Sequence, residues 1–172
     1  MQERRSVAAL NSMRSSDGVA GSGLRRWILL AGTAAAVVVV DRITKSLAVS
    51  RLADHPVHVI GPLWLRLSYN TGAAFGIAQG WSMELAVIAV ALIAVLIFVG
   101  RSTSMNLGIV AIGLMLGGAV GNLSDRLFGN ASGAVVDFVY TGFWPTFNVA
   151  DACIVIGGVL LVLTMSRAKR PH

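Results

Sequence analysis

Charged residues and cysteine are scarce in this chain. Charged side chains make up 13% of the 172 residues, whereas hydrophobic residues make up 55% and the mean hydropathy is +0.73. This composition excludes a soluble domain of this size and predicts one small integral membrane protein. The single cysteine, Cys153, excludes an intrachain disulfide and any metal site built from several thiolates.

Histidine is also scarce, and none of the three histidines lies in an apolar run. A serine peptidase of the membrane interior needs a histidine base in such a run, so this class is disfavoured. Asp54, His55 and His58 are close in sequence, but they lack a fourth ligand, and Pro56 separates the two histidines. Paired aspartates, considered below, need neither a metal nor a cofactor, and we expect none.

The net charge of +6 comes from basic residues that lie beside apolar runs and are not interleaved with aromatic residues. This distribution argues against a nucleic-acid partner and is typical of membrane topology signals. Nine basic residues fall in the two tails and in the 101–106 turn, so the positive-inside rule predicts that both termini are cytoplasmic. We expect a disordered basic tail over 1–26, a membrane domain over 27–166 and a short tail over 167–172.

Four apolar segments approach the length that a helix needs to cross a bilayer. The predicted spans are 27–47, 83–99, 106–126 and 147–165. The outer connection 50–82 alternates apolar and polar residues between prolines and glycines, which predicts a small extracytoplasmic β-sheet. The second outer connection, 127–146, holds aromatic residues and a proline, typical of a loop or helix along the membrane interface. The predicted fold class is an all-α integral membrane protein with four transmembrane helices.

Four aspartates fall at the outer interface in this topology, namely Asp41, Asp125, Asp137 and Asp151. Placing a carboxylate at the centre of a membrane helix costs about 2.5 to 3.5 kcal/mol of free energy. An acid near hydrocarbon is therefore expected to have a partner or a function. Asp41 and Lys45 are one helical turn apart, and an interfacial ion pair would explain both. Arg126 is available to neutralise Asp125.

Asp137 and Asp151 are the acids that could act as a catalytic pair. Two carboxyls held close together share one proton, so the ionised group can activate a water while the protonated group stabilises an oxyanion. One alternative is structural, with Asp151 in the first turn of a helix and Asn148 as its cap. A second alternative is a transporter with a proton relay, but the acids lie at one interface and no internal repeat is evident.

Five short motifs follow one another along the chain: DRITK, NTGAAFG, GGAVGNLSDR, VVDF and FNVAD. Together they resemble the motifs of the lipoprotein signal peptidases, or signal peptidase II, the aspartic peptidases of bacterial membranes. The resemblance implies that Asp137 and Asp151 are the catalytic pair. It implies that ten further positions shape or support the site, namely Asp41, Lys45, Asn70, Gly72, Gly118, Asn122, Asp125, Arg126, Asn148 and Ala150.

The resemblance also implies an activity. The expected enzyme removes the signal peptide from diacylglyceryl-modified prolipoproteins and cuts just before the lipidated cysteine. We expect globomycin to inhibit the enzyme. We also expect the protein to be surrounded by the lipid of the cytoplasmic membrane, the inner membrane of the cell, with its site at the extracytoplasmic face. Four helices with one site predict a monomer. Compared with the family, the basic tail is long, and the connection from VVDF to FNVAD is short.

Overall fold

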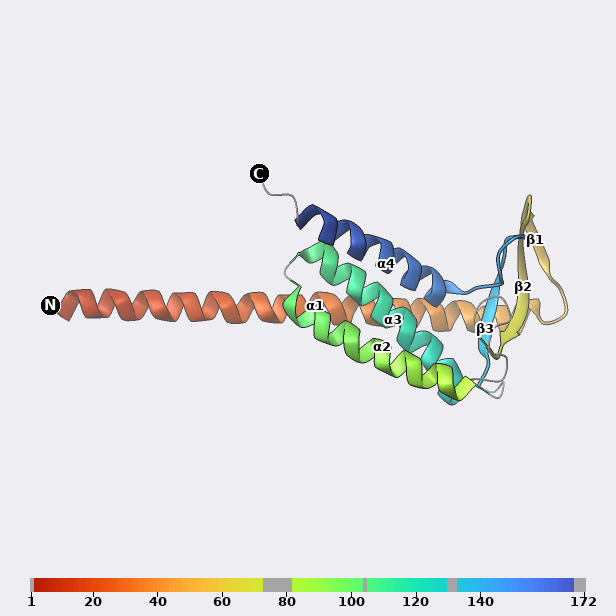
Figure 1. Ribbon diagram of the computed structural model, residues 1–172, viewed down its shortest axis with the longest axis horizontal. Helices are drawn as coiled ribbons and strands as arrows, with labels where there is room; N and C mark the ends of the chain where they lie inside the picture. The colour runs from red at the N-terminus through yellow and green to blue at the C-terminus, as the bar shows by residue number, and fades with distance from the viewer. Residues whose placement is uncertain (1, 73–81, 104, 130–132, 169–172) are drawn as a thin grey trace.

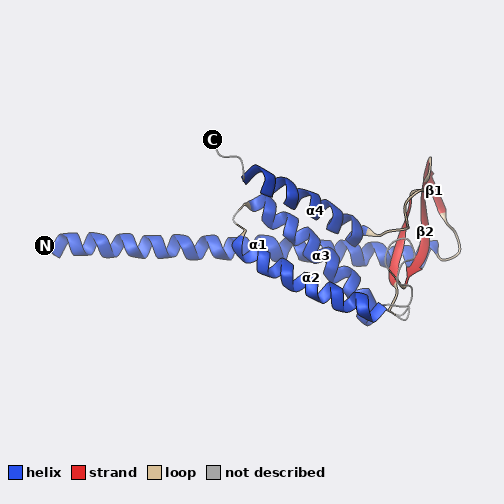
Figure 2. Cartoon of the chain, viewed as in Figure 1, coloured by secondary structure: helices blue, strands red, loops and turns tan. Residues whose placement is uncertain are grey.

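The computed structural model describes residues 2–72, 82–103, 105–129 and 133–168, and within these ranges it describes side chains from residue 23 to residue 166. The helices of this part of the chain are α1 (Gln2–Leu52), α2 (Ser82–Ser102), α3 (Asn106–Phe128) and α4 (Val149–Ala168). The strands are β1 (Val57–Ile60), β2 (Leu63–Asn70) and β3 (Val135–Tyr140). The helices form an elongated bundle, and the strands form a small sheet at one of its ends (Figures 1 and 2).

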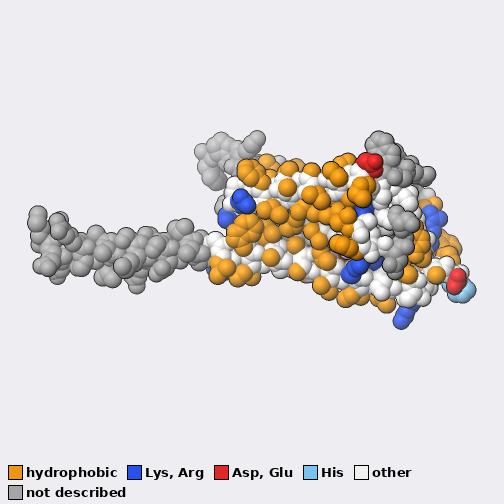
Figure 3. Space-filling model, turned by 90° about the horizontal axis from the view of Figure 1, so that it is seen from below, with side chains coloured by type: hydrophobic (Ala, Val, Ile, Leu, Met, Phe, Trp, Pro, Cys, Tyr) orange, Lys and Arg blue, Asp and Glu red, His pale blue; other side chains and the backbone are white. Residues whose placement is uncertain are grey.

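Each of the four helices contains a stretch that is long and apolar enough to cross a membrane. These stretches are Gly23–Leu52, Ser82–Ser102, Asn106–Phe128 and Val149–Ser166. The predicted four transmembrane helices are therefore confirmed, and the chain is a multi-pass membrane protein. Hydrophobic side chains cover most of the bundle face seen in Figure 3, as contact with lipid requires, and charged groups lie mainly toward its two ends.

The first helix starts much earlier than the sequence predicts. It begins at Gln2, whereas we expect a disordered tail as far as residue 26. Residues 2–26 contain no proline, and a helix already formed in the first span can extend without a new nucleation step. The boundaries 1–26, 27–166 and 167–172 stay predictions, and residues 169–172 lie outside the described part of the chain.

Helix α3 lies against α1 and α4, and glycines permit the close packing. A Cβ atom added at Gly117 would lie 2.6 Å from the carbonyl oxygen of Ala34 in α1, and one added at Gly118 would collide with the carbonyl of Ala150 in α4. Small residues allow this approach of helix backbones in membranes. The crossing brings together the ends of α1, α3 and α4 that lie near the sheet, where Asp41, Asp125 and Asp151 are found.

The sheet is antiparallel in the order β1, β2, β3. The hairpin of β1 and β2 confirms the predicted sheet between the first two spans, whereas β3 corrects the prediction for 127–146. This connection contributes a strand, with Ser68 opposite Asp137 and Asn70 opposite Val135. Valines and aromatic residues in VVDFVY favour a strand, and β2 offers an edge whose backbone groups need partners. The pairing fixes Asp137 on a rigid element.

Candidate active site

Asp137 in β3 and Asp151 in the first turn of α4 line the same cavity, which has a volume of about 270 Å³. Asn70 of β2 and Asn122 and Arg126 of α3 also line it. The chain thus brings two carboxylates, two carboxamides and one guanidinium to one hollow from four different elements. All five had been predicted as site residues from the sequence.

Asp151 is held by the cap of its own helix. The backbone N–H of Asp151 donates to Asn148 Oδ1 at 2.9 Å, and the backbone N–H of Asn148 donates to Asp151 Oδ2 at 3.2 Å. This reciprocal pair is a capping box, which satisfies two amide groups that the start of a helix leaves free. The other carboxylate oxygen, Oδ1, accepts a hydrogen bond of 2.7 Å from Asn122 Nδ2. The predicted capping role and a role in the site are therefore compatible.

Asp137 is buried, with 2% of its surface exposed. Its carboxylate accepts hydrogen bonds from Asn148 Nδ2 at 2.7 Å and from Asn70 Nδ2 at 3.1 Å. Asn148 itself is fully buried, and through two different nitrogens it donates to both aspartates. Asn148 therefore sets the position of Asp137 relative to Asp151, because its side-chain nitrogen contacts Asp137 and its backbone N–H contacts Asp151.

The pKa of Asp137 is raised from 3.8 to about 7, because burial and, after it, the neighbouring charge of Asp151 raise the pKa more than the hydrogen bonds from Asn70 and Asn148 lower it. Removing a carboxyl from water disfavours its ionised form, and a second negative charge acts in the same direction. Near neutral pH, Asp137 therefore holds a proton in a large fraction of molecules. A carboxyl poised in this way can donate a proton and take it back.

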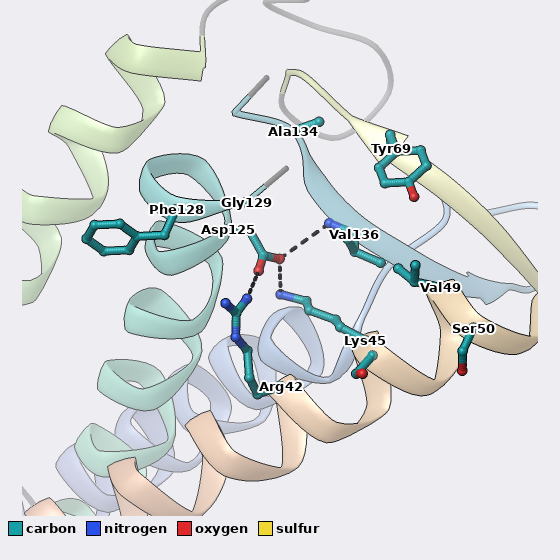
Figure 4. A pocket seen from close by; sticks show the side chains of 11 residues that line it. Arg42, Lys45, Val49, Ser50, Tyr69, Asp125, Phe128, Gly129, Ala134 and Val136 are labelled. Atoms are coloured by element: carbon teal, nitrogen blue, oxygen red, sulfur yellow. Dashed lines mark hydrogen bonds and ion pairs between the residues drawn. The ribbon is translucent and has the colours of Figure 1, made fainter. Parts of the chain in front are cut away.

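Next to this cavity lies a cluster of ionic groups, in which Lys45 and Asp125 are buried and Arg42 is half exposed; Figure 4 shows these three side chains. Lys45 Nζ lies 2.7 Å from Asp41 Oδ2 and 2.8 Å from Asp125 Oδ2, and Arg42 Nη1 lies 2.8 Å from Asp125 Oδ1. Asp41 and Lys45 therefore form the predicted ion pair, and because they are 0% and 3% exposed the pair lies inside the protein and not on its surface. They are buried because their face of α1 packs on α3, and pairing offsets much of the desolvation.

Arg126 is not the ion-pair partner of Asp125, contrary to the sequence-based expectation. Successive residues of a helix point about 100° apart, so Arg126 faces another direction. Its Nη2 donates to the carbonyl oxygen of Gly72 at 3.2 Å, and the Gly72 N–H donates to Asn70 Oδ1 at 3.0 Å. Arg126 therefore joins α3 to the chain that follows β2. Residues 73–76 of the NTGAAFG motif lie outside the described part of the chain.

The ionic cluster is connected to the two aspartates. Lys45 Nζ donates to Asn122 Oδ1 at 3.0 Å, and Asn122 Nδ2 in turn contacts Asp151. Asp41 Oδ1 accepts a hydrogen bond of 3.0 Å from the N–H of Ala150. The cluster therefore orients the Asn122 amide and anchors the first turn of α4.

Sequence reasoning missed two features of this region. Arg42, the second cation on Asp125, lies one turn before Lys45 on α1, and this spacing could have indicated it. The other is a neighbouring apolar cavity lined in part by Thr141 and Phe143. Nothing in the sequence pattern singles out these two residues, because the fold of the connection between β3 and α4 creates the hollow.

Comparison with known proteins identifies similar chains. The family model described as Signal peptidase (SPase) II matches residues 33–167. A lipoprotein signal peptidase of Rhodococcus jostii is 44% identical over 144 residues, which cover 81% of this chain and 73% of that protein. One of Mycobacterium avium is 43% identical over 145 residues, covering 81% and 79%. A solved bacterial membrane enzyme has a TM-score of 0.71 at 29% identity, covering 81% of this chain and 90% of its own.

Proposed function

This chain belongs to the signal peptidase II family, and we propose that it cuts its substrate as an aspartic endopeptidase with Asp137 and Asp151 as the catalytic pair. It is a peptidase that removes signal peptides from prolipoproteins. The observation that carries the proposed pair is the bridging by Asn148, which contacts both carboxylates beside a cavity that also holds Arg126. The alternative of a transporter or proton relay gains no support from the relatives.

In the proposed reaction, a water lies between the two carboxyls. Ionised Asp151 takes a proton from this water as its oxygen attacks the carbonyl carbon of the scissile bond, and protonated Asp137 donates a proton to the carbonyl oxygen. When the carbon–nitrogen bond breaks, the proton on Asp151 passes to the leaving nitrogen, and Asp137 recovers its proton from the re-forming carbonyl. The products are a carboxylic acid and a free amine, and both aspartates return to their first states.

We propose that the substrate carries a diacylglyceryl group on a cysteine and that the cut falls just before this cysteine. The site belongs at the extracytoplasmic face of the cytoplasmic membrane. The positive-inside rule supports this orientation, since nine basic residues fall, by sequence, in the two tails and in the 101–106 turn. We also propose that the protein acts as a monomer and that globomycin inhibits it.

The proposal is tested with the full-length protein in lipid nanodiscs and a diacylglyceryl-modified precursor, with cleavage followed as a shift on a gel. Asp137→Asn and Asp151→Asn should each lower kcat/KM by at least about 100-fold, since general acid–base groups contribute this much. Asp54→Asn is the matched control, because Asp54 is an exposed aspartate of the outer connection. Turnover at the wild-type rate by either site variant would rule out the pair.

A further inference from the structure

A second cavity, of about 400 Å³, adjoins the cavity of the two aspartates. Its lining comes from the connection after β3 and from α4, and consists of Thr141, Phe143, Trp144, Phe147, Asp151, Ala152, Val155 and Ile156. Four of these residues, among them Asp151, also line the first cavity. A ligand in the second cavity therefore reaches the carboxylate that we propose to activate water.

This second cavity suits an aliphatic chain. Its walls are aromatic and aliphatic, apart from the oxygen atoms of Thr141 and Asp151 and the indole of Trp144. Val155 and Ile156 are 65% and 53% exposed on a helix that crosses the membrane, so the cavity borders the region that lipid occupies. A hydrocarbon chain can enter it from the bilayer without passing through water, and its burial there is favourable.

One polar group in the wall has no partner. Thr141 Oγ1 is buried and makes no hydrogen bond with any residue that the structure describes. A buried hydroxyl without a partner is disfavoured, and such groups are rare in folded proteins. The hydroxyl and methyl groups of threonine occupy staggered positions about one bond, so a rotation of about 120° exchanges them. Thr141 can thus present a hydrogen-bond donor to a ligand in this cavity.

A fatty acyl ester combines both properties, because it has a long apolar chain and one carbonyl oxygen that accepts a hydrogen bond. We propose that the second cavity binds one acyl chain of the diacylglyceryl group on the substrate cysteine, with the Thr141 hydroxyl donating to the ester carbonyl. This inference rests on the proposed function. Only a few bonds separate the ester from the cysteine backbone, so the bound lipid places the scissile bond beside Asp151. Lipid recognition and cleavage then depend on adjacent parts of one site.

The test compares two precursors that differ in one feature, a glyceryl group with two ester-linked chains or with two ether-linked chains, which lack carbonyls. Thr141→Val keeps the shape and removes the hydroxyl, and it should raise KM for the diester precursor by about three- to tenfold, the range of one neutral hydrogen bond. Its KM for the diether precursor should change less than about twofold. Thr141→Ser, which keeps the hydroxyl, should preserve the preference for the ester.

A second variant tests where the chain lies. Ile156→Trp fills the cavity and should raise KM for precursors with long acyl chains more than for precursors with short ones. Val162→Trp is the control, because Val162 is a similarly exposed residue of α4 outside the lining.

The inference fails if Thr141→Val changes KM equally for the diester and the diether precursors, or changes KM for neither. It fails too if Ile156→Trp acts equally on long and short chains, which would assign the cavity to the signal peptide or to bulk lipid. Both tests use variants that still cleave the precursor, so failure of this inference would not contradict the assignment of Asp137 and Asp151 as the catalytic pair.

Discussion

Asn148 and Asp151 exchange two hydrogen bonds at the start of α4, of 2.9 and 3.2 Å, so a catalytic candidate is also part of a helix cap. The position of its carboxylate is therefore set by the local geometry of the helix terminus. The side-chain nitrogen of Asn148 remains free for Asp137, which it contacts at 2.7 Å. Capping and the spacing of the two carboxyls thus depend on one residue.

Substitutions of Asn148 should separate these two roles. Asn148→Ser keeps an oxygen that can cap α4 but removes the nitrogen that contacts Asp137, so kcat should fall, and the loss of this buried contact should lower thermal stability. Asn148→Ala removes both, and the lost cap should lower stability by about 1 kcal/mol more. Thermal unfolding in detergent and a cleavage assay measure the two effects. Equal stability of the serine and alanine variants would contradict the capping role.

The raised pKa of Asp137 predicts how activity depends on pH. Because Asp137 is proposed to act in its protonated form and its pKa is about 7, kcat/KM should decline above pH 7, by about tenfold per pH unit once the carboxyl is ionised. Initial rates between pH 5 and pH 9 on one lipidated precursor measure this. A rate that stays constant to pH 9 would mean that Asp137 does not supply a proton.

The same pKa has a consequence for stability. The folded chain holds the Asp137 proton up to about pH 7, whereas the unfolded chain loses it near pH 3.8, so the folded state binds more protons between these values. Stability should therefore decline as pH rises from about 4 to 7, by on the order of 4 kcal/mol. Asp137→Asn, which resembles the protonated form, should show a flatter profile of Tm against pH. Asp54→Asn should keep the wild-type profile.

The membrane spans could be predicted from the sequence because a helix in lipid needs a long apolar run, and such runs are visible without knowledge of the fold. The third strand could not be predicted in the same way. VVDFVY also suits a loop at an interface, and only its pairing with β2, a segment far upstream, makes it a strand. The motifs of the family indicated the residues around the site, and the tertiary structure supplied their contacts.

The ion-pair partners of Asp125 show why some contacts could not be predicted from the sequence. Arg126 is its neighbour in sequence, yet the cations that bind Asp125 come from α1, across a helix interface that glycines permit. Sequence adjacency gives proximity along the helix, but the direction of each side chain decides which groups meet. The same argument applies to Thr141, whose surroundings are set by the path of the chain between β3 and α4.

Loss of Lys45 should be strongly destabilising. Lys45→Met leaves Asp41 without its cation and Asp125 with Arg42 alone, and removing one partner of a buried ionic group typically costs about 3 to 5 kcal/mol. The double substitution Asp41→Asn with Lys45→Met should recover part of this loss, because it no longer leaves an unpaired charge at Asp41. Arg51→Met, an exposed position on α1, should change Tm little. A Lys45→Met variant as stable as wild type would show that the cluster is dispensable.

The contact between α3 and α4 gives the last prediction. A methyl group added at Gly118 would collide with the carbonyl of Ala150, the residue before Asp151, whereas one added at Gly158 of α4 meets no atom within 4 Å. Gly118→Ala should therefore separate the helices, displace the first turn of α4 and lower both Tm and kcat. Gly158→Ala should raise stability by up to about 1 kcal/mol, because alanine favours helix over glycine and nothing opposes it there. Since the two substitutions are chemically identical, their difference isolates the close approach at Gly118, and equal activity and Tm in both variants would mean that this contact does not position Asp151.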